Sequence, residues 1–311
     1  MKILLTGING NLGQELSDWF VHHNVEVIPC VRSGRKEEIL RHFPKVIIAD
    51  LTSEDISFSE NIDCIVHCAG VVHFQKAGNQ NESMMRKIVG FAKSKKIPVY
   101  HVSTAFVYRP DGSTNFHNSY EADKYNAERV LLESGIPNAI FRPSVLVGSS
   151  KDGSIRNLSG YYSIAEAFLG AIVMAQANKR IIRFPKMTGE SNIVPIDIAA
   201  AVIGCKILEG QRGTVYVTNP NPPSSMWTLD ETLDFFRVSG DIQIVDITFE
   251  EFGTLDLTPE EDRLYKFSKH FNPYWSTKFT FPETACPNFE INHAYMVKIL
   301  NYFQKIKNTH A

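Results

Sequence analysis

Short apolar runs alternate with amphipathic segments along the first 150 residues of the chain. The apolar runs lie at 3–5, 25–30, 46–49, 64–68, 99–103 and 139–142. Runs of this length are typical of strands that are buried on both faces, and the segments between them have helical spacing. The alternation therefore predicts an α/β fold with a doubly wound parallel sheet, whose ligands bind at the carboxyl ends of the strands.

The regular alternation fades from about residue 149 onward. A proline-rich turn at 219–223 and an aromatic-rich stretch at 267–281 take its place. We therefore expect residues 1–150 to form the sheet domain and residues 151–311 to form a smaller, irregular substrate-capping region, with segments that return to the sheet. Six aromatic residues of this region are candidates for a pocket lining, with core packing as the alternative for each: Tyr161, Tyr162, Phe168, Phe271, Tyr274 and Trp275.

Composition narrows the class of protein. The 311 residues are 43% hydrophobic, enough for a large core, and the formal net charge of −2 gives no electrostatic reason to expect a nucleic acid partner. The five cysteines form no C-x-x-C pair, and Cys64 and Cys68 lie in an apolar run, so we expect reduced thiols and no metal site. No apolar run approaches the roughly 18 residues that span a bilayer, and the first residues already form a strand. We expect a cytoplasmic protein without a signal peptide.

Three glycines punctuate the turn from the first strand into the first helix. Gly7, Gly10 and Gly13 stand between the run 3–5 and apolar residues at helical spacing. Such a turn presents bare backbone N–H groups and the positive end of a helix dipole, where a pyrophosphate fits. The spacing differs from the G-x-G-x-x-G fingerprint, and a tight turn without a ligand is the alternative.

Residues after the next strands bear on the choice of cofactor. A site selective for NAD usually has an acid after the second strand, whereas this chain has Arg32 and Arg35. Two guanidinium groups fit a 2′-phosphate, with solvated loop cations as the alternative. Asp50-Leu51 follows the third strand, where a contact with the adenine edge is expected, and Ala69-Gly70 follows the fourth, where small residues let a cofactor approach the backbone.

Candidate catalytic residues come at the end of the fifth strand and in the helix after it. Ser103 and Thr104 end the strand, and Tyr120 and Lys124 are four residues apart, on one helix face. A neighbouring lysine is expected to lower the pKa of the tyrosine phenol, so that it exchanges a proton near neutral pH. Thr104 and Tyr120 would hold the oxyanion that hydride delivery to a carbonyl creates. A solvated helix face is the alternative for the Tyr-Lys pair.

Taken in order, these motifs resemble those of an extended short-chain dehydrogenase/reductase with a Rossmann-type sheet. They are TGINGNLG at 6–13, HCAG at 67–70, STAFVY at 103–108, YEADK at 120–124 and RPS at 142–144, and the resemblance covers roughly residues 1–250. Within that superfamily, four further segments are similar to the thioester-reductase and fatty acyl-CoA reductase branch: Val72-His73-Phe74, RPSVLVG at 142–148, NIVPIDIAAAVI at 192–203 and VYVTNPNPPS at 215–224.

The resemblance implies roles for individual residues and NADPH as the cofactor. Thr104, Tyr120 and Lys124 match the catalytic triad, and the active-site asparagine of the family falls on Asn81, with Asn79 as the alternative. The predicted cofactor-binding residues are Gly7, Asn9, Gly10, Asn11, Leu12, Gly13, Arg32, Arg35, Asp50, Leu51, Ala69, Gly70, Ser103, Lys124, Pro143 and Val145. Two departures from the family pattern are a loop of only 15 residues between Thr104 and Tyr120 and the acidic Asp123 before the lysine.

The sequence thus predicts a cytoplasmic, NADPH-dependent reductase that converts an acyl thioester to an aldehyde; reduction on to the alcohol and the oligomeric state stay open. The chain shows no carrier-protein or adenylation region, so the acyl group would arrive on a separate carrier protein or on coenzyme A. The alternatives are a nucleotide-sugar epimerase, dehydratase or ketoreductase of the same fold, and a non-enzymatic regulator that binds NADP(H).

Overall fold

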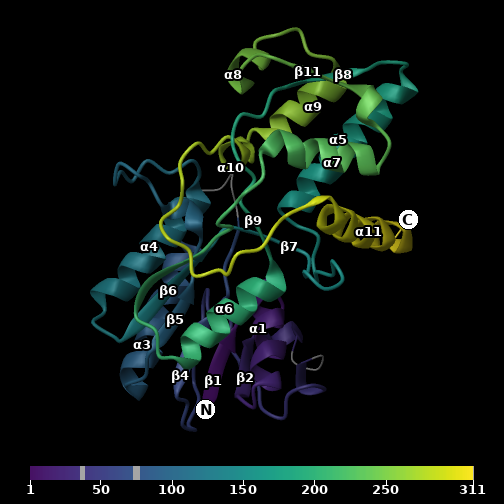
Figure 1. The fold of residues 1–311 in the computed structure, drawn as a ribbon. Helices are drawn as coiled ribbons and strands as arrows, with labels where there is room; N and C mark the ends of the chain where they lie inside the picture. The colour runs from purple at the N-terminus through teal and green to yellow at the C-terminus, as the bar shows by residue number, and fades with distance from the viewer. Residues whose placement is uncertain (36–38, 73–77, 311) are drawn as a thin grey trace. The chain divides into compact units, whose positions relative to one another are not determined.

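A computed structural model of the chain describes residues 1–35, 39–72 and 78–310, which form two compact units. Unit 1 consists of Met1–Ser144, Ile196–Thr218 and Phe281–Cys286. Unit 2 consists of Val145–Pro195, Asn219–Thr280 and Pro287–Ala311. Figure 1 colours both units by residue number, and the late segments of unit 1 appear in it as green and yellow ribbon. No helix among the described residues is long and apolar enough to cross a membrane.

Seven parallel strands form the sheet of unit 1, in the order β10-β6-β5-β4-β1-β2-β3 (Figure 1). In chain order they are β1 (Lys2–Thr6), β2 (Glu26–Val31), β3 (Ile47–Ile48), β4 (Cys64–His67), β5 (Val99–Val102), β6 (Asn138–Pro143) and β10 (Gly213–Val217). All six apolar runs of the first half are strands, which confirms the predicted doubly wound sheet. The strand order reverses between β1 and β4, where sheets of this topology bind their ligands.

Helices cover both faces of this sheet. On one face α3 (Gln80–Lys95) packs against α4 (Ser119–Glu133), and on the other α1 (Asn11–His22) packs against α6 (Ile196–Leu208). The second pair approaches closely because Gly204 of α6 lies against Trp19 of α1. A Cβ atom at position 204 would come within 2.3 Å of the indole ring.

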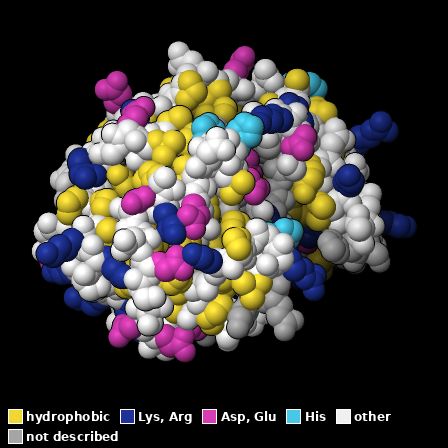
Figure 2. All heavy atoms as spheres, turned by 90° about the horizontal axis from the view of Figure 1, so that it is seen from below, with side chains coloured by type: hydrophobic (Ala, Val, Ile, Leu, Met, Phe, Trp, Pro, Cys, Tyr) yellow, Lys and Arg dark blue, Asp and Glu magenta, His cyan; other side chains and the backbone are white. Residues whose placement is uncertain are grey.

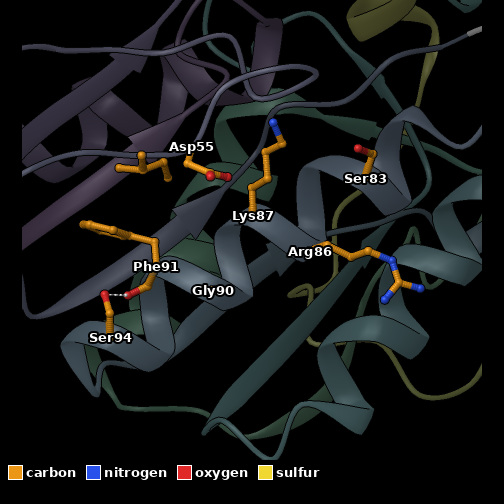
Figure 3. A pocket seen from close by; sticks show the side chains of 8 residues that line it. Asp55, Ser83, Arg86, Lys87, Gly90, Phe91 and Ser94 are labelled. Atoms are coloured by element: carbon orange, nitrogen blue, oxygen red, sulfur yellow. Dashed lines mark hydrogen bonds between the residues drawn. The ribbon is translucent and has the colours of Figure 1, made fainter.

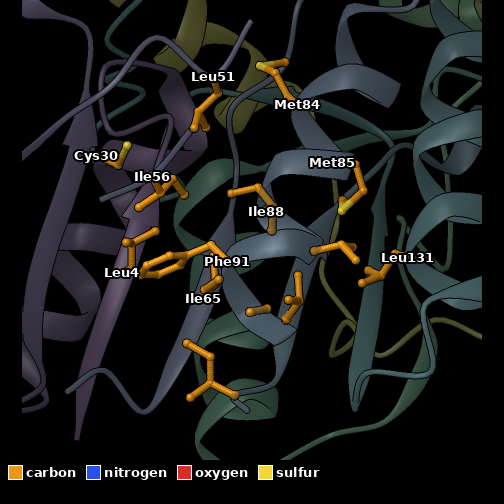
Figure 4. Close-up of a cluster of buried hydrophobic side chains, with 14 of the residues drawn as sticks. Leu4, Cys30, Leu51, Ile56, Ile65, Met84, Met85, Ile88, Phe91 and Leu131 are labelled. Atoms are coloured by element: carbon orange, nitrogen blue, oxygen red, sulfur yellow. The ribbon is translucent and has the colours of Figure 1, made fainter. Parts of the chain in front are cut away.

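Apolar packing fixes α3 on the sheet. Figure 4 shows Ile88 and Phe91 of α3 facing Leu4 of β1 and Ile65 of β4, and all four side chains are buried. Removing such a side chain from water contributes about 1.5–3 kcal/mol. The first turn of α3, which begins at the carboxyl edge of the sheet, is therefore held in a fixed place.

Unit 2 is built from short strands and helices. The strands β7 (Val145–Val147) and β9 (Ile193–Pro195) pair with each other, as do β8 (Ile182–Pro185) and β11 (Ile242–Val245). The helices are α5 (Tyr161–Ala177), α7 (Ser225–Phe235), α8 (Phe249–Phe252), α9 (Pro259–Ser268), α10 (Asn272–Trp275) and α11 (His293–His310). A short 3-10 turn, η3 (Ser239–Asp241), also belongs to unit 2, whereas η1 (Ser33–Arg35) and η2 (Ala105–Val107) belong to unit 1.

Most of the aromatic candidates of unit 2 are core residues. Phe168 and Trp275 belong to its hydrophobic cluster. The buried Tyr162 hydroxyl accepts a hydrogen bond from the Gly148 N–H at 2.9 Å, and the Tyr161 hydroxyl lies 2.7 Å from Thr232 Oγ1. Core packing thus describes these four aromatic residues, whereas Phe271 and Tyr274 are half-buried.

Candidate active site

The glycine-rich turn folds as a tight connection between β1 and α1. Gly7 has a φ of +76°, and a Cβ atom there would lie 2.5 Å from the Ala69 amide nitrogen. A Cβ atom on Gly13 would lie 2.1 Å from the Gly7 carbonyl oxygen. Helix α1 begins at Asn11, and its N-cap, Gly10, supplies no side-chain cap. A helix N-terminus after a glycine turn of this kind is suited to binding an anion.

A hydroxyl at the end of β1 orders the backbone at the end of β4. The Thr6 Oγ1 atom accepts a hydrogen bond from the Ala69 N–H at 3.1 Å and lies 2.8 Å from Nδ1 of His67. Burial, helped by the positive charge of Lys124, lowers the pKa of His67 to about 3, so its imidazole is neutral. His101, the register partner of His67 on β5, stacks on it with ring centroids 5.3 Å apart. The sequence analysis did not single out His101, because nothing in its local pattern marks it.

Asn81 is a buried member of the site, in the first turn of α3. Its Oδ1 accepts from the Val71 N–H at 2.9 Å, and its Nδ2 donates to the Val71 carbonyl at 3.0 Å and to Asp123 Oδ2 at 2.9 Å. A Cβ atom on Gly70 would lie 3.3 Å from Asn81 Oδ1 and 3.1 Å from Lys124 Nζ. Asn81 and Lys124 therefore flank Gly70, whereas Asn79 is exposed.

Asp123 has a structural reason for its departure from the family pattern. Although it belongs to α4, its carboxylate accepts hydrogen bonds from the N–H groups of Asn81 at 2.8 Å and Glu82 at 3.1 Å. It thus caps α3 from the neighbouring helix, as an acidic group at a helix N-terminus does.

Lys124 is a cation almost without contact with water. Its side chain is 4% exposed, and Nζ donates to the Val102 carbonyl oxygen at 2.9 Å. Burial lowers the pKa of Lys124 to about 8. The ammonium group is thus held at the end of β5, next to the small Gly70.

Tyr120 lies in the first turn of α4, which Asn118 caps by accepting from the Glu121 N–H at 3.0 Å. Burial, together with the negative charge of Glu121, raises the pKa of the Tyr120 phenol above its ordinary value. The direction of this shift is opposite to the expectation that Lys124 lowers the pKa, because burial and the charge of Glu121 both disfavour the phenolate. The phenol is consequently protonated at neutral pH and suited to act as a proton donor.

Hydroxyl groups gather at the carboxyl ends of β5 and β6. Thr104 is buried and caps η2, where its Oγ1 accepts from the Phe106 N–H at 3.4 Å. The buried hydroxyls of Ser103 and Ser144 have no hydrogen-bond partner in the described part of the chain. Buried polar groups of this kind are expected to pair with a ligand. Together with the glycine turn they fit a dinucleotide with a polar carboxamide end.

The remaining predicted cofactor contacts are spread over both units. Pro143 ends β6 in unit 1, whereas Val145 opens β7 in unit 2, where its N–H donates to the Asn192 carbonyl at 3.2 Å. Leu12 is buried in the first turn of α1, and Asn9 precedes that turn.

At the adenine end, Arg32 follows β2 and is exposed, and Arg35 ends η1. The Asp50 carboxylate accepts hydrogen bonds from the Thr52 hydroxyl at 2.8 Å and from the Thr52 N–H at 3.0 Å. These two bonds lower the pKa of Asp50, and the positive charges of Arg32 and Lys87 lower it further. Leu51 beside it is buried.

A predicted apolar contact falls partly outside the described residues. In the segment Val72-His73-Phe74, His73 and Phe74 are not described, and Val72 is 56% exposed.

A pocket of about 500 Å³ is lined by residues of α3 and by Asp55 and Ile56. Figure 3 shows Lys87 extending from α3 toward Asp55, whereas Arg86 points away and pairs with Glu82 at 2.6 Å. The lining residues are Asp55, Ile56, Ser83, Arg86, Lys87, Gly90, Phe91 and Ser94. Lys87, whose charge helps to lower the pKa of Asp50, was not predicted as a site residue, because a single lysine on a helix has no distinguishing sequence pattern.

On the face shown in Figure 2, acidic and basic side chains are intermingled.

The fold and the glycine turn define an NAD(P)-binding domain of the extended short-chain dehydrogenase/reductase class. The profile of the male sterility protein family, an NAD-binding family, matches residues 44–203, just over half of the chain. The chain belongs to this family.

Known relatives agree with this assignment. The hybrid PKS-NRPS synthetase xenE of Xenoacremonium sinensis is 27% identical over 252 residues, which cover 70% of this chain and 6% of that protein. The chain thus spans only a small part of that curated relative.

Solved structures share the fold at low identity. The terminal R domain of the myxalamid PKS-NRPS pathway has a TM-score of 0.73 at 20% identity, covering 98% of this chain and 91% of that one. An archaeal thiolation-reductase di-domain of a non-ribosomal peptide synthetase has a TM-score of 0.69 at 18% identity, covering 99% and 91%. A UDP-glucose 4-epimerase has a TM-score of 0.63 at 16% identity, covering 99% of each chain.

Proposed function

We propose that this protein is an NADPH-dependent reductase of acyl thioesters. The observation that carries the proposal is that Asn81 and Lys124 flank Gly70 and that Lys124 Nζ donates to the Val102 carbonyl at the end of β5. Thr104 lies two residues after β5, and Tyr120 lies one turn before Lys124 on α4. This set can bind a cofactor ribose and donate a proton to a carbonyl oxygen. Membership of the male sterility family and the likeness to reductase domains support a thioester as the substrate.

Different residues would bind the two ends of NADPH. The N–H groups after Gly7 and Gly10 would hold the pyrophosphate, and Arg32 with Arg35 would hold the 2′-phosphate. Asp50 and the Leu51 backbone would meet the adenine. At the other end, Lys124 would hold the ribose hydroxyls, and the unpaired hydroxyls of Ser103 and Ser144 would be available to the carboxamide group. When bound, NADPH supplies the hydride.

Three side chains of the protein would act in the reaction. As the thioester carbon gains a hydride, the carbonyl oxygen takes up the electron pair of the C=O bond. The Thr104 hydroxyl donates a hydrogen bond to this oxygen, and the Tyr120 phenol donates its proton. The hydroxyl proton of the resulting hemithioacetal then returns to the Tyr120 phenolate as the C=O bond of an aldehyde forms. The C–S bond breaks at the same time, and the leaving thiolate takes a proton from water. The Lys124 ammonium favours the phenolate that Tyr120 forms between its two proton transfers.

The acyl group would be carried by a carrier protein or by coenzyme A. The chain resembles a short part of a hybrid PKS-NRPS synthetase, and one similar structure is a thiolation-reductase di-domain, in which the carrier is covalently attached. Both observations favour a substrate whose thiol is a phosphopantetheine arm.

A substrate panel tests the proposal. The purified chain is mixed with NADPH and, in parallel, with acyl-coenzyme A, acyl-carrier thioesters, simple ketones and UDP-sugars, and the absorbance of NADPH is followed. We expect oxidation with one or more thioesters and none with the sugars. Turnover of ketones alone, or of UDP-sugars alone, would assign the chain to another activity of the same fold. Binding of NADPH without turnover of any of them would favour a regulator.

A further inference from the structure

One guanidinium group ties together the short loop between the two proposed oxyanion donors. Arg109 lies in this loop, and its side chain is only 8% exposed. Its Nη1 donates to the carbonyl oxygens of Phe106 and Tyr108, both at 2.8 Å, and its Nε donates to the carbonyl of Asn115 at 2.9 Å. The side chain thus joins the start of the loop, after Thr104, to its end, before α4.

The same group also neutralises a carboxylate beside Tyr120. Arg109 Nη2 donates to Glu121 Oε2 at 2.7 Å, and the His117 N–H donates to the same oxygen at 3.0 Å. The Glu121 side chain is fully buried. Burial works against its charged form, but the hydrogen bonds from His117 and Arg109 keep the pKa of Glu121 below its ordinary value. A buried carboxylate that lost this partner would be strongly unfavourable.

Aromatic contacts anchor the loop on both sides of Arg109. The Phe106 ring packs edge-on against Phe281 of the returning segment Phe281–Cys286, with centroids 5.5 Å apart. Phe116 packs against Tyr125 of α4 at 5.1 Å, and the Arg109 guanidinium lies 5.4 Å from the centre of the Phe116 ring. The loop is therefore packed at both ends, and Arg109 is the polar link between them.

We propose that Arg109 is a positioning residue that fixes Thr104 and Tyr120 so that both hydroxyl groups donate to one carbonyl oxygen. The inference rests on the proposed function. Thr104 lies five residues before Arg109, and Tyr120 precedes the carboxylate that Arg109 holds. A displacement of about 1 Å at such a site costs about 100-fold in rate. Lysine cannot replace the arginine, because one ammonium group does not span three carbonyls and a carboxylate as the planar fork does.

The first experiment compares turnover in Arg109→Lys and in the double variant Arg109→Met with Glu121→Gln. The double variant removes the buried charge together with its partner, so that folding is preserved. We expect both to lose 10-fold to 100-fold in kcat, with the NADPH Kd changed less than twofold. The matched control, Arg129→Lys, alters an exposed arginine on α4 that pairs with Glu133 and should behave as the unaltered protein. Full activity in the double variant would overturn the proposal, since charge neutralisation would then be the only role of Arg109.

A second readout does not require turnover. In protein labelled with ¹³C at tyrosine Cζ, the Tyr120 signal is assigned by its loss in Tyr120→Phe. We expect this signal to shift in Arg109→Lys and to stay in place in Arg129→Lys. An unmoved signal in Arg109→Lys would overturn the positioning role. If no thioester is reduced by the unaltered protein, the proposed function fails, and this measurement still decides the role of Arg109.

Discussion

A buried ammonium group gives Lys124 a response to pH that a surface lysine does not have. Its pKa of about 8 lies below the ordinary 10.5 because burial penalises the charge. Lys124 would therefore be charged below about pH 8 and neutral above it. If the charged form holds the ribose and favours the Tyr120 phenolate, kcat/KM should fall as the pH rises through about 8. A profile of kcat/KM between pH 6 and 10 measures this, and a flat profile would contradict it.

The free energy of unfolding should rise with pH above about pH 8, where kcat/KM is expected to fall. Between about pH 8 and 10.5 the unfolded chain keeps a proton on Lys124 that the folded chain has lost. The unfolded state thus binds more protons, so the free energy of unfolding contributed by this group rises with pH. Urea denaturation at pH 7.5 and pH 9.5 should show this rise in the unaltered protein relative to Lys124→Met. Equal changes in the two proteins would mean that Lys124 is not desolvated.

The Tyr120 phenol is the proposed proton donor, and its raised pKa keeps it protonated at neutral pH. Tyr120→Phe removes the hydroxyl and little volume. We expect NADPH binding to be retained and turnover to fall by about 100-fold to 10,000-fold, the usual effect of losing a general acid. Cofactor fluorescence and steady-state kinetics separate the two effects. Near-normal turnover would mean that the proton comes from another group.

The arginines after β2 are proposed to select the phosphorylated cofactor. Each charge-assisted hydrogen bond contributes about 1.5–3 kcal/mol, so the double variant Arg32→Ala with Arg35→Ala should lose most of a preference for NADPH over NADH. Titrations of both cofactors measure the ratio of Kd values. Arg129→Ala removes an exposed arginine of α4 and should leave the ratio unchanged. Equal affinities in the unaltered protein would disprove the selection.

At the scale of elements, the contact between α3 and α4 determines where Asn81 lies. Asp123 makes three of the hydrogen bonds that join these helices, all to the first turn of α3. Helix caps and hydrogen bonds to charged groups are each worth about 1–3 kcal/mol. The first turn of α3 is therefore stabilised by a residue of another helix.

Asp123→Ala should destabilise the protein by about 1–3 kcal/mol and lower turnover, because Asn81 loses its fixed orientation. Urea denaturation and kinetics measure the two effects. Asp152→Ala serves as the control, since Asp152 is exposed and holds only a local turn at Ser154. Unchanged stability in Asp123→Ala would show that the cap contributes nothing.

Local sequence patterns predicted the strands that are buried on both faces of the sheet. Strands buried on both faces are continuous apolar runs, and for this reason the first six strands of the sheet were found. Segments that return to the sheet were expected, but the strand β10 was not located, because α5, α6 and three short strands separate it along the chain from its neighbour β6. The sign of the Tyr120 pKa shift was also missed, since a four-residue spacing places a lysine nearby but does not reveal desolvation.

At the scale of the whole chain, the sequence indicated that segments return to the sheet but did not identify the residues that make the tertiary contacts. Arg109 reaches residues on both sides of its loop, and the segment Phe281–Cys286 joins unit 1 from far along the chain, where Ala285 N–H donates to the Tyr216 carbonyl at 2.9 Å. A lone arginine or a short segment with one phenylalanine has no periodicity that marks such contacts. These links become visible only when the strands and helices are placed.

The central claim is that a hydride from NADPH reaches a thioester carbon and that the thiol leaves as a result. Single-turnover reaction with NADPH carrying deuterium at the transferred position tests it most directly. We predict deuterium at the aldehyde carbon and one thiol released for each NADPH oxidised in the first turnover, with both slowed by about 100-fold or more in Tyr120→Phe. Oxidation of NADPH without release of thiol, or thiol release without deuterium in the product, would contradict the account.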